Sequence, residues 1–544
     1  MLDKLVLKYW MTNKPIRVVI VGGGGAGVFA AAALKLNCTN VDVVMLHDPA
    51  TPYIGVGESL GFTTRRFMRD YLHFERDEDW VVGTNSTYKL GVVHTGFDGT
   101  DTPHYSTHFF QPSAKILDQS IISAYQQSLP PGVGLPPTGS ADDQHSLVDI
   151  WLHLYAKGLR KLETREADLS EMYWYIHYGT MPDPDHHEHH DRTTSFHMNA
   201  DYAKDFIFDQ LCAPNNVSVI PKKIKQVKVN EQGISALVCD DDTEVVGDLY
   251  IDCTGFKRIL ATQLPFQWVK LAEEFSDSAI VGQGPNHHGL SVPSTSVTEH
   301  HAMNNGWAFS LPMPERSGNG YVFNSRLSGN EDLLIQEFDQ KFPWKAGCIK
   351  RKIQWEPGYY EKFFVQNCIV LGISSGFTDP YDANGFTTVL RYIERMVQYI
   401  QQDPARTFDW QHKFNEFGAG LVQDAQLRIQ TGLWCCTKNN SEYWQAMHRA
   451  AKRDNLVEQW REAMFDPARK YRNKDNYKFG WTQGVNINHA MYYGIDVKIP
   501  TLPISETTEQ LAINFFDFFS RKNQLQAQQA KKVNDFYKTL YKLN

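Results

Sequence analysis

The chain has 544 residues, of which 42% are hydrophobic and 21% are charged, a composition that excludes disordered, fibrous and polytopic membrane proteins. Its 54 basic and 62 acidic residues give a formal net charge of −8. Because there is no basic surplus to neutralise phosphates, nucleic acid is not expected as a partner. The eight cysteines are scattered, and only Cys435 and Cys436 are adjacent, which favours a reducing, cytoplasmic compartment.

The uncharged run at residues 18–34 follows Lys14 and Arg17 and therefore imitates a signal peptide. Four successive glycines at 22–25 interrupt the run, and glycine is poor in the interior of a helix. No other stretch reaches the roughly 18 apolar residues that are needed to span a bilayer. We therefore expect neither a targeting segment nor membrane association.

The same run makes sense as a strand, a tight turn and the start of a helix. Residues 16–21 and 41–46 are mostly β-branched and apolar, as in buried parallel strands, and residues 28–36 between them have helical composition. This order predicts a βαβ unit that opens a doubly wound sheet.

Further along the chain, the pattern becomes less regular. Residues 111–143 are rich in proline, glycine and serine and predict a long surface excursion, whereas residues 196–212 predict a helix. We expect a returning strand at 244–253. Residues 306–325 predict two strands joined by a turn at 316–320.

A glycine pattern between the first strand and the helix indicates a nucleotide site. Gly22, Gly24 and Gly27 have the spacing of the dinucleotide-binding fingerprint, in which glycines permit a tight turn, close backbone approach to a pyrophosphate, and helix–strand packing. The N–H groups at the helix start, including those of Gly25 and Ala26, favour an anion. The alternative is a glycine-rich turn without a ligand.

An acidic residue is expected at the end of the second strand, where it would hold a ribose. His47 stands at about that position and Asp48 follows, so we predict Asp48 as the ribose ligand. Residues 247–256 resemble the returning segment of flavoprotein monooxygenases, in which a strand ends in an acid, here Asp252, near the cofactor. An ordinary edge strand is the alternative. Together with the N-terminal unit, this resemblance implies FAD.

Five segments in chain order resemble motifs of the flavin-dependent halogenases of the tryptophan halogenase family. They are Ile-Gly-Val-Gly-Glu-Ser at 54–59, the lysine segment at 85–92, Ser-Phe-His-Met-Asn-Ala at 195–200, Gly-Trp-Ala-Phe-Ser-Leu-Pro at 306–312, and Gly-Ile-Ser-Ser-Gly-Phe-Thr-Asp-Pro-Tyr-Asp-Ala-Asn-Gly at 372–385. Each match alone is weak, but five in order, including the lysine, are strong.

The resemblance implies a reaction sequence. Reduced FAD from a separate reductase would react with O2 to give a hydroperoxide, and a halide would then release hypohalous acid. The acid would pass through an internal tunnel to Lys89, and Asp382, in place of the family's glutamate, would polarise it or accept the arenium proton. Backbone N–H groups at Asn384 and Gly385 would hold the halide.

The resemblance also implies a cofactor shell and a flavin–substrate gate. The remaining cofactor-binding residues would be Glu58, Ser59, Gly372 and Phe386. The gate would contain Trp307, Phe309 and Pro312. Without the resemblance, a lysine in this polar context is usually a surface charge, aspartates before a helix are usually caps, and alternating strand aromatics are usually core.

The predicted fold class is α/β, an FAD-binding doubly wound, Rossmann-like domain of the flavoprotein monooxygenase type with an added substrate region and a helical C-terminal part. We expect a discontinuous FAD-binding domain at 15–390, with the substrate region threaded through it at about 95–200 and 260–345. Residues 391–544 are expected to be mainly helical, and the segment at 527–544 to be a loosely held tail.

The histidine-rich loop at 183–191 does not change this interpretation. His186, His187, His189 and His190 beside Asp191 form a single local cluster without remote ligands, so we predict no metal. A second nucleotide fingerprint for NAD(P)H is also missing, which agrees with a separate flavin reductase.

We therefore expect FADH2-dependent halogenation of a small, electron-rich arene of the indole or phenol type, with O2 and a halide as co-substrates. An FAD-dependent aromatic hydroxylase and a non-catalytic flavin-binding protein are the alternatives. The preferred halide stays open. The many aromatic residues after position 390 are compatible with a pocket, a core or a contact between subunits, so a homo-oligomer stays open too.

Overall fold

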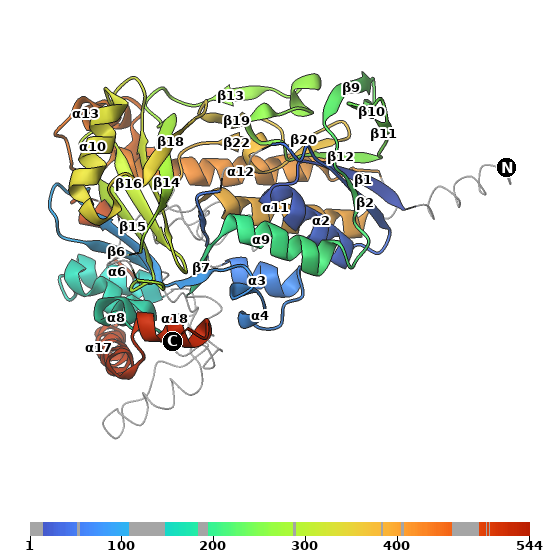
Figure 1. Ribbon diagram of the computed structural model, residues 1–544. Coiled ribbons are helices and arrows are strands. Elements are labelled where there is room, and N and C mark those ends of the chain that lie inside the picture. Colours follow the sequence, from blue (N-terminus) through green and yellow to red (C-terminus); the bar gives the residue numbers. More distant parts are fainter. Residues whose placement is uncertain are drawn as a thin grey trace.

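The computed structural model describes residues 15–543 apart from 52–54, 62, 108–146, 183–193, 287–289, 382–383, 404–406, 460–488, 497 and 500 (Figure 1). At residues 147 and 384 it describes the backbone alone. Asp382 and the histidine-rich loop thus lie outside the described residues. Within the described ranges, no helix is long and apolar enough to cross a membrane, and no group of three or more His, Cys, Asp and Glu side chains could hold a metal ion.

A six-stranded sheet in the order β20-β21-β12-β1-β2-β8 forms the first layer. Its strands are β1 (Ile16–Val21), β2 (Val41–Leu46), β8 (Ser218–Ile220), β12 (Leu249–Asp252), β20 (Phe364–Val365) and β21 (Cys368–Val370). Every neighbouring pair is parallel except β20 and β21. This sheet confirms the predicted α/β class and the Rossmann-like arrangement.

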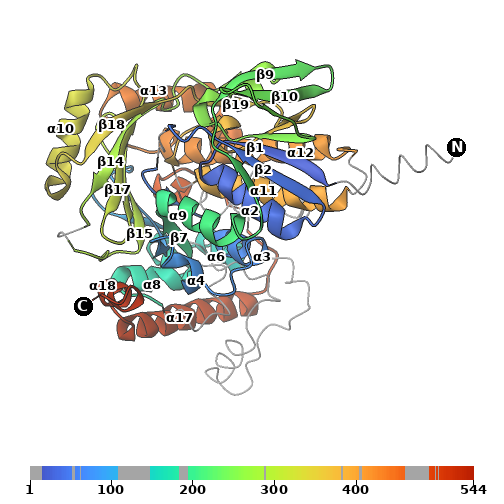
Figure 2. The ribbon, with the colours of Figure 1, turned by 45° about the vertical axis from the view of Figure 1, so that its right-hand side comes forward.

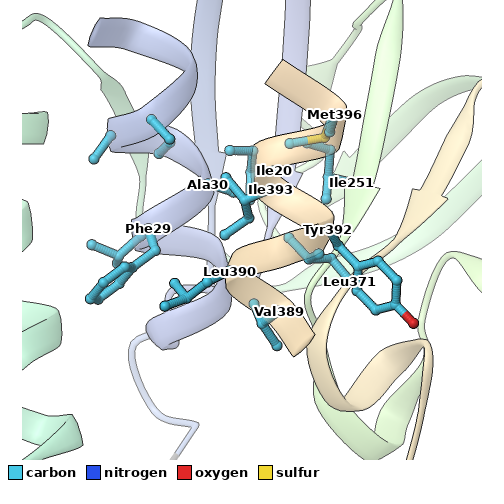
Figure 3. Close-up of a cluster of buried hydrophobic side chains, with 14 of the residues drawn as sticks. Ile20, Phe29, Ala30, Ile251, Leu371, Val389, Leu390, Tyr392, Ile393 and Met396 are labelled. Atoms are coloured by element: carbon cyan, nitrogen blue, oxygen red, sulfur yellow. The ribbon is translucent and has the colours of Figure 1, made fainter. Parts of the chain in front are cut away.

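Two helices from opposite ends of the sequence cover this sheet, α2 (Gly25–Asn37) and α11 (Asn384–Gln402). Figure 3 shows Ile20 and Ile251 of the strands close to Ala30 of α2 and Ile393 of α11. Ala30 is fully buried, as are the three alanines after it, and their small side chains let α2 lie close to its neighbours. The shared core joins the N-terminal βαβ unit to a helix more than 300 residues away.

A seven-stranded sheet in the order β18-β14-β17-β16-β15-β5-β6 forms the second layer. Its strands are β5 (Gly91–Thr95), β6 (His104–Thr107), β14 (Ser278–Gly284), β15 (Val297–Ala302), β16 (Trp307–Pro312), β17 (Ser317–Phe323) and β18 (Ile349–Gln354). Helix α10 (Glu331–Lys341) covers one face of it, where Leu334 and Phe338 pack against Ile280 and Tyr321 (Figure 1).

Three smaller sheets complete the strand inventory of the described residues. They are β3 (Glu58–Ser59), β7 (Ser195–Met198) and β4 (Thr87–Lys89); β9 (Ile224–Asn230), β10 (Gly233–Cys239) and β11 (Glu244–Val245); and β13 (Trp268–Lys270), β19 (Gly358–Tyr360) and β22 (Gly376–Phe377).

The remaining α-helices lie around these sheets, and α17 runs along α8 in both views (Figures 1 and 2). Their bounds are α3 (Thr63–Asp70), α4 (Glu78–Val81), α6 (Leu147–Ala156), α7 (Arg165–Leu169), α8 (Glu171–Tyr178), α9 (Ala200–Ile207), α12 (Gln411–Ile429), α13 (Glu442–Arg453), α17 (Glu506–Gln529) and α18 (Val533–Leu540).

Several local predictions need correction. The strands at 16–21 and 41–46 are confirmed, but the first helix begins at Gly25, because glycines there do not prevent a helical first turn. The predicted helix at 196–212 is wrong in its first part, since residues 195–198 pair with β3 and β4. The predicted strand at 244–253 is two strands, β11 and β12, in different sheets.

Two further corrections concern the later part of the chain. The turn after β16 lies before residue 317, and the residues expected to form it, 317–320, belong to β17. The prediction of a loosely held C-terminal tail is also wrong, because α18 is anchored by Val533 and Tyr537, which are buried. The limit drawn between residues 390 and 391 falls within α11, and the division into domains stays a prediction.

Candidate active site

A cavity of about 790 Å³ opens at the carboxyl ends of β1 and β2. In parallel α/β sheets this is the edge where ligands bind. Of the residues predicted to bind the cofactor, those that line the cavity are Gly22, Gly24, Gly25, Ala26, Asp48, Glu58, Gly372 and Phe386. Gly385 of the predicted halide site also lines it.

The glycine loop is shaped for close backbone approach. Gly22 has a φ of +119°, and a Cβ there would lie 2.3 Å from the Cys253 carbonyl oxygen. A Cβ on Gly27 would lie 2.1 Å from the Gly22 carbonyl oxygen, so Gly27 is needed for packing and does not line the cavity. Gly24 is the N-cap of α2 and has no side chain to bond the first-turn N–H groups, which are therefore available to an anion at this end of the cavity.

Asp48 lies at the end of β2, on the rim of the cavity beside His47. Its Oδ1 accepts a hydrogen bond from the Ala50 backbone N–H at 2.9 Å, which fixes the turn that follows the strand. Burial lowers the pKa of His47, and the nearby Lys204 lowers it further, so the imidazole is neutral near neutral pH. The carboxylate of Asp48 and the neutral imidazole of His47, which can both donate and accept a hydrogen bond, are thus neighbours at the place where a ribose would be held.

Sequence reasoning missed four basic residues of the cavity lining, Lys204, Lys222, Lys223 and Lys257. They come from α9, from the loop after β8 and from the turn after β12, and no motif links them. The Lys222 ammonium contacts the Asp241 carboxylate at 2.5 Å, and the Lys257 ammonium reaches the Thr51 hydroxyl at 3.5 Å. Positive charge here complements a pyrophosphate on the glycine loop.

Asp252 has a different position from the one predicted, because it does not line the cavity. It is buried, and its carboxylate accepts hydrogen bonds from the backbone N–H groups of Thr254, Leu260 and Ala261 at 2.8–3.0 Å. It also accepts from the hydroxyls of Thr254 and Ser374. The carboxylate therefore organises the loop at 253–261, whose Thr254, Gly255 and Lys257 line the cavity.

Gly372 and the start of α11 line the cavity next to the glycine loop. Gly372 has a φ of +69°, and a Cβ there would lie 2.9 Å from the Ala26 Cβ at the start of α2. Phe386 stacks edge-on against Phe29 of α2, with the ring centroids 5.1 Å apart. Gly385 has open space around its Cα, so its backbone is accessible from the cavity.

Lys89, at the end of β4, is buried with 3% of its surface exposed. Its Nζ donates a hydrogen bond to the Leu60 carbonyl at 3.1 Å, and the same carbonyl accepts from the Ser195 hydroxyl at 2.6 Å. The ammonium does not line the 790 Å³ cavity. The segment 58–61 connects Lys89 to this cavity. Glu58 lines the cavity, and the Gly61 N–H donates a hydrogen bond to the Thr387 hydroxyl of α11 at 2.8 Å.

A line of neutral polar groups accompanies this segment. His197 bridges the Thr87 hydroxyl, 3.2 Å from Nδ1, and the Thr298 hydroxyl, 2.9 Å from Nε2. Thr298 in turn shares a 2.8 Å hydrogen bond with Ser59, so the Ser59 side chain points away from the cavity that it was predicted to line. Burial holds the pKa of His197 well below its usual value, with Lys89 adding to the effect. Burial raises the pKa of Glu58 to about 7.

The predicted gate residues stand on β16. Trp307 is fully buried, and its ring centroid lies 6.0 Å from that of Phe309, 4.9 Å from that of His300 and 5.4 Å from that of Tyr381. Pro312 contributes its carbonyl, which accepts a hydrogen bond from the Thr87 hydroxyl at 2.7 Å. These residues thus lie beside the Lys89 strand and outside the lining of the 790 Å³ cavity.

A cluster of imidazole rings lies next to Trp307, and the sequence analysis did not predict it. The His94 ring lies 4.7–5.1 Å from the rings of His104, His300 and His489, and its Nδ1 is 3.1 Å from the Tyr381 hydroxyl. Burial holds the pKa of His94 well below its usual value, and the neighbouring imidazoles and Lys89 lower it further. The four residues come from β5, β6, β15 and the chain after 488, which explains why no motif predicted them.

Asp379 links the cavity to this aromatic layer. It lines the cavity, and its Oδ1 accepts a hydrogen bond from the Tyr381 N–H at 3.0 Å. Burial raises the pKa of Asp379 to about 6, although the hydrogen bond from the Tyr381 N–H stabilises the carboxylate. Asp382 lies outside the described residues, and for Asn384 only the helical backbone is described, so their predicted side-chain roles stay predictions.

The residues present fit a dinucleotide such as FAD. A glycine loop that a Cβ would fill, helix-start N–H groups, an acid after β2 and four lysines line one cavity. Phe377, Phe386 and Gly372 add an aromatic and backbone part to the lining, which suits a planar ring system.

Comparison with known proteins agrees with this geometry. The sequence profile described as tryptophan halogenase matches residues 17–130 and 134–491. The chain is 26% identical over 479 residues to a tryptophan 6-halogenase of Streptomyces toxytricini, with 84% of this chain and 86% of that protein covered. It is 27% identical over 476 residues to a 7-chloro-L-tryptophan 6-halogenase of Kutzneria sp., covering 81% and 83%.

Solved structures show the same fold. The crystal structure of the Streptomyces toxytricini tryptophan 6-halogenase superposes with a TM-score of 0.76 at 21% identity, covering 96% of this chain and 99% of that one. A flavin-dependent halogenase from Brevundimonas sp. BAL3 gives a TM-score of 0.74 at 19% identity, covering 97% and 99%.

Proposed function

Because the chain belongs to the tryptophan halogenase family and is thus a flavin-dependent halogenase, we propose that it replaces an aromatic C–H by C–halogen in a small, electron-rich arene of the indole or phenol type. The cofactor would be FADH2 from a separate reductase, and O2 and a halide would be the co-substrates. The observation that carries the proposal is the segment from Glu58 to Gly61, which connects the dinucleotide cavity to the buried Lys89.

The cavity would hold FAD with its pyrophosphate at the N-terminus of α2 and its ribose near Asp48. When bound, the reduced cofactor would supply the electrons that turn O2 and a halide into an electrophilic halogen species. Lys204, Lys222 and Lys257 would neutralise the phosphates, and Asp252 would keep the loop at 253–261 in place.

The start of α11 would hold the halide. The first N–H groups of a helix have no partner within it, and in α11 they belong to Asn384, Gly385 and Phe386. Gly385 offers no side chain that would keep an ion away from the backbone, and it lines the cavity. A desolvated halide is favoured there by the N–H groups and the helix dipole.

Lys89 would receive the electrophile and present it to the arene. Its burial keeps the oxidant out of water, and an ammonium can donate a hydrogen bond to hypohalous acid or, as the amine, form a haloamine. The passage from the cavity would follow the side of the Glu58–Gly61 segment that faces Trp307. Trp307 and Phe309 would separate the arene from the flavin, and Asp382 would accept the arenium proton.

We also propose that the protein acts in the cytoplasm. All eight cysteines are free, as a reducing cytoplasm requires. The arene would lie near Lys89 and the histidines, whose imidazoles burial keeps neutral.

The test supplies the purified protein with reduced FAD, O2 and bromide in the presence of a panel of indoles and phenols, with products identified by mass spectrometry. A brominated product that disappears without bromide supports the proposal. A hydroxylated product formed without halide would instead establish a hydroxylase, and flavin binding without any product would establish a non-catalytic protein. Competition among chloride, bromide and iodide in the same assay gives the halide preference.

A further inference from the structure

A second cavity, of about 230 Å³, lies on the seven-stranded sheet away from the flavin cavity. Its lining consists of Asn286, Pro293, Ser294, Thr295, Glu299, Ser310, Pro312, Ser317 and Lys345. This lining is mostly polar, and it contains one acidic and one basic side chain. The volume is below that of pockets for drug-sized ligands, so the cavity is suited to a small molecule.

Strand register places this cavity on the face of the sheet opposite the proposed active site. His300 pairs with Phe309, and Glu299 pairs with Ser310, across the antiparallel strands β15 and β16. Paired residues share a face, and successive residues alternate between faces. His300 and Phe309 face the Lys89 side, so Glu299 and Ser310 face the side that α10 covers.

Lys345 is the buried cation of this second cavity. It ends the short 3-10 helix Pro343–Lys345 after α10 and has 5% of its surface exposed. Its Nζ donates to the Ser310 hydroxyl at 2.6 Å and to the Asn319 Oδ1 at 3.0 Å. Both acceptors are neutral, and among the described residues Lys345 forms no ion pair. An ammonium has three N–H donors, so one is left for a ligand.

Glu299 is the anion of the same lining. It is half-buried, and within the described part of the chain its carboxylate forms no hydrogen bond or ion pair. Burial lowers the pKa of Lys345, the nearby charge of Glu299 offsets part of this effect, and no salt bridge joins the two side chains. Two opposite charges therefore face one small cavity and do not neutralise each other directly. Leaving the buried ammonium without an opposite charge in contact is costly, which favours a ligand that reaches both side chains.

The charge pattern selects the ligand class. A simple anion would be attracted by Lys345 and repelled by Glu299. A simple cation would be attracted by Glu299 and repelled by Lys345. A small zwitterion complements both, with its carboxylate at Lys345 and its ammonium at Glu299. Asn286 adds a hydrogen-bond acceptor. Its Nδ2 donates to the Met313 carbonyl at 2.9 Å, so its Oδ1 is the atom that could accept a hydrogen bond from the ligand's ammonium.

We propose that this cavity binds a small zwitterion of the free α-amino acid class, at a site separate from the flavin and Lys89. The site goes beyond the halogenation proposed above and does not depend on it. A bound ligand would contact the strand that carries Trp307 and Phe309, from its other face. Pro312 lines the cavity with its ring, and its carbonyl accepts the hydrogen bond from Thr87.

The test is isothermal titration of the full-length, FAD-saturated protein with glycine and L-alanine, and in parallel with acetate and methylammonium. The proposal predicts binding of the amino acids and at least about tenfold weaker binding of either single-charge probe. Acetate binding as tightly as glycine would overturn the zwitterion assignment, and the absence of any heat with both amino acids would overturn the site.

Variants locate the binding. Glu299→Gln and Lys345→Met should each weaken glycine at least about tenfold. Lys341→Met, on an exposed lysine of α10 that does not line the cavity, should leave it unchanged, as should Lys89→Ala. If Lys345→Met fails to fold, Glu299→Gln decides, because its side chain is half-buried and without a partner among the described residues. Unchanged glycine binding in Glu299→Gln would refute the proposal.

Discussion

The Tyr537 hydroxyl accepts a hydrogen bond from the Tyr88 backbone N–H at 2.8 Å and donates one to the Tyr88 carbonyl at 3.2 Å. Both residues are buried, and Lys89 follows Tyr88 directly. A side chain of the C-terminal helix α18 thus takes the place of a neighbouring strand at the edge of β4. The position of the proposed catalytic lysine depends on residues almost 450 positions further along the chain.

Removal of the Tyr537 hydroxyl should therefore destabilise the protein at β4. Tyr537→Phe leaves two buried backbone groups without a partner and should lower the free energy of unfolding by about 1–3 kcal/mol. Tyr202→Phe is the matched control, because its side chain is 54% exposed. Thermal or urea denaturation measures both. Equal stability of Tyr537→Phe and the wild type would show that water replaces the hydroxyl.

Gly22→Ala should weaken FAD binding at least about tenfold, because the new Cβ would lie 2.3 Å from the Cys253 carbonyl and would move the turn under the pyrophosphate. Gly99→Ala is the control for backbone strain, since Gly99 also has a positive φ, of +82°, but nothing lies within 4 Å of its Cβ position. Fluorescence titration with FAD separates the two. Equal losses in both variants would point to general destabilisation.

Asp252→Ala tests whether that carboxylate acts through its loop. Three backbone N–H groups and two hydroxyls lose their acceptor, so we expect a loss of about 3 kcal/mol or more in stability together with weaker FAD binding. Asp240→Ala, at an exposed hairpin position, should change neither. Weaker FAD binding with unchanged stability would instead indicate direct contact with the cofactor.

The buried histidines predict a loss of stability on acidification. Burial holds the pKa values of His94, His197 and His300 well below 6.5, so the unfolded chain takes up protons that the folded chain does not as pH falls through this range. Glu58 and Asp379, with pKa values raised to about 7 and 6, act in the opposite direction, but they are fewer.

The melting temperature of the ligand-free protein should therefore fall from about pH 7 to about pH 5. His300→Gln should make this dependence shallower, whereas His412→Gln, on the surface, should not. A melting temperature that rises on acidification would mean that the carboxylates outweigh the imidazoles.

Local sequence signals predicted the parts of the site that are themselves local. The glycine loop, Asp48 and the strands around them follow one another in the chain, so spacing alone placed them at one edge of the sheet. Lys89 and Trp307 were proposed as site residues only because a family pattern marks them, since their immediate sequence context does not distinguish a lysine or tryptophan of a site from any other.

The remainder depends on tertiary contacts that no local pattern encodes. Tyr537 lies in a polar, charged stretch that resembles a tail, yet it is fully buried because β4 and β7 offer a surface for α18. The strand at 195–198 has helix-compatible composition, and its pairing with β3 and β4 overrides that preference. Asp252 was assigned to the cofactor because of its position at a strand end, although its neighbours in the fold use every oxygen.

The most direct test of the account is the halogenating activity of Lys89→Ala. With reduced FAD, O2, bromide and an arene that the wild type brominates, the variant should form no brominated product above background while binding FAD as the wild type does. Lys228→Ala, at an exposed lysine of β9, should retain full activity. Retained bromination in Lys89→Ala would contradict the proposal that the electrophile is delivered by this lysine.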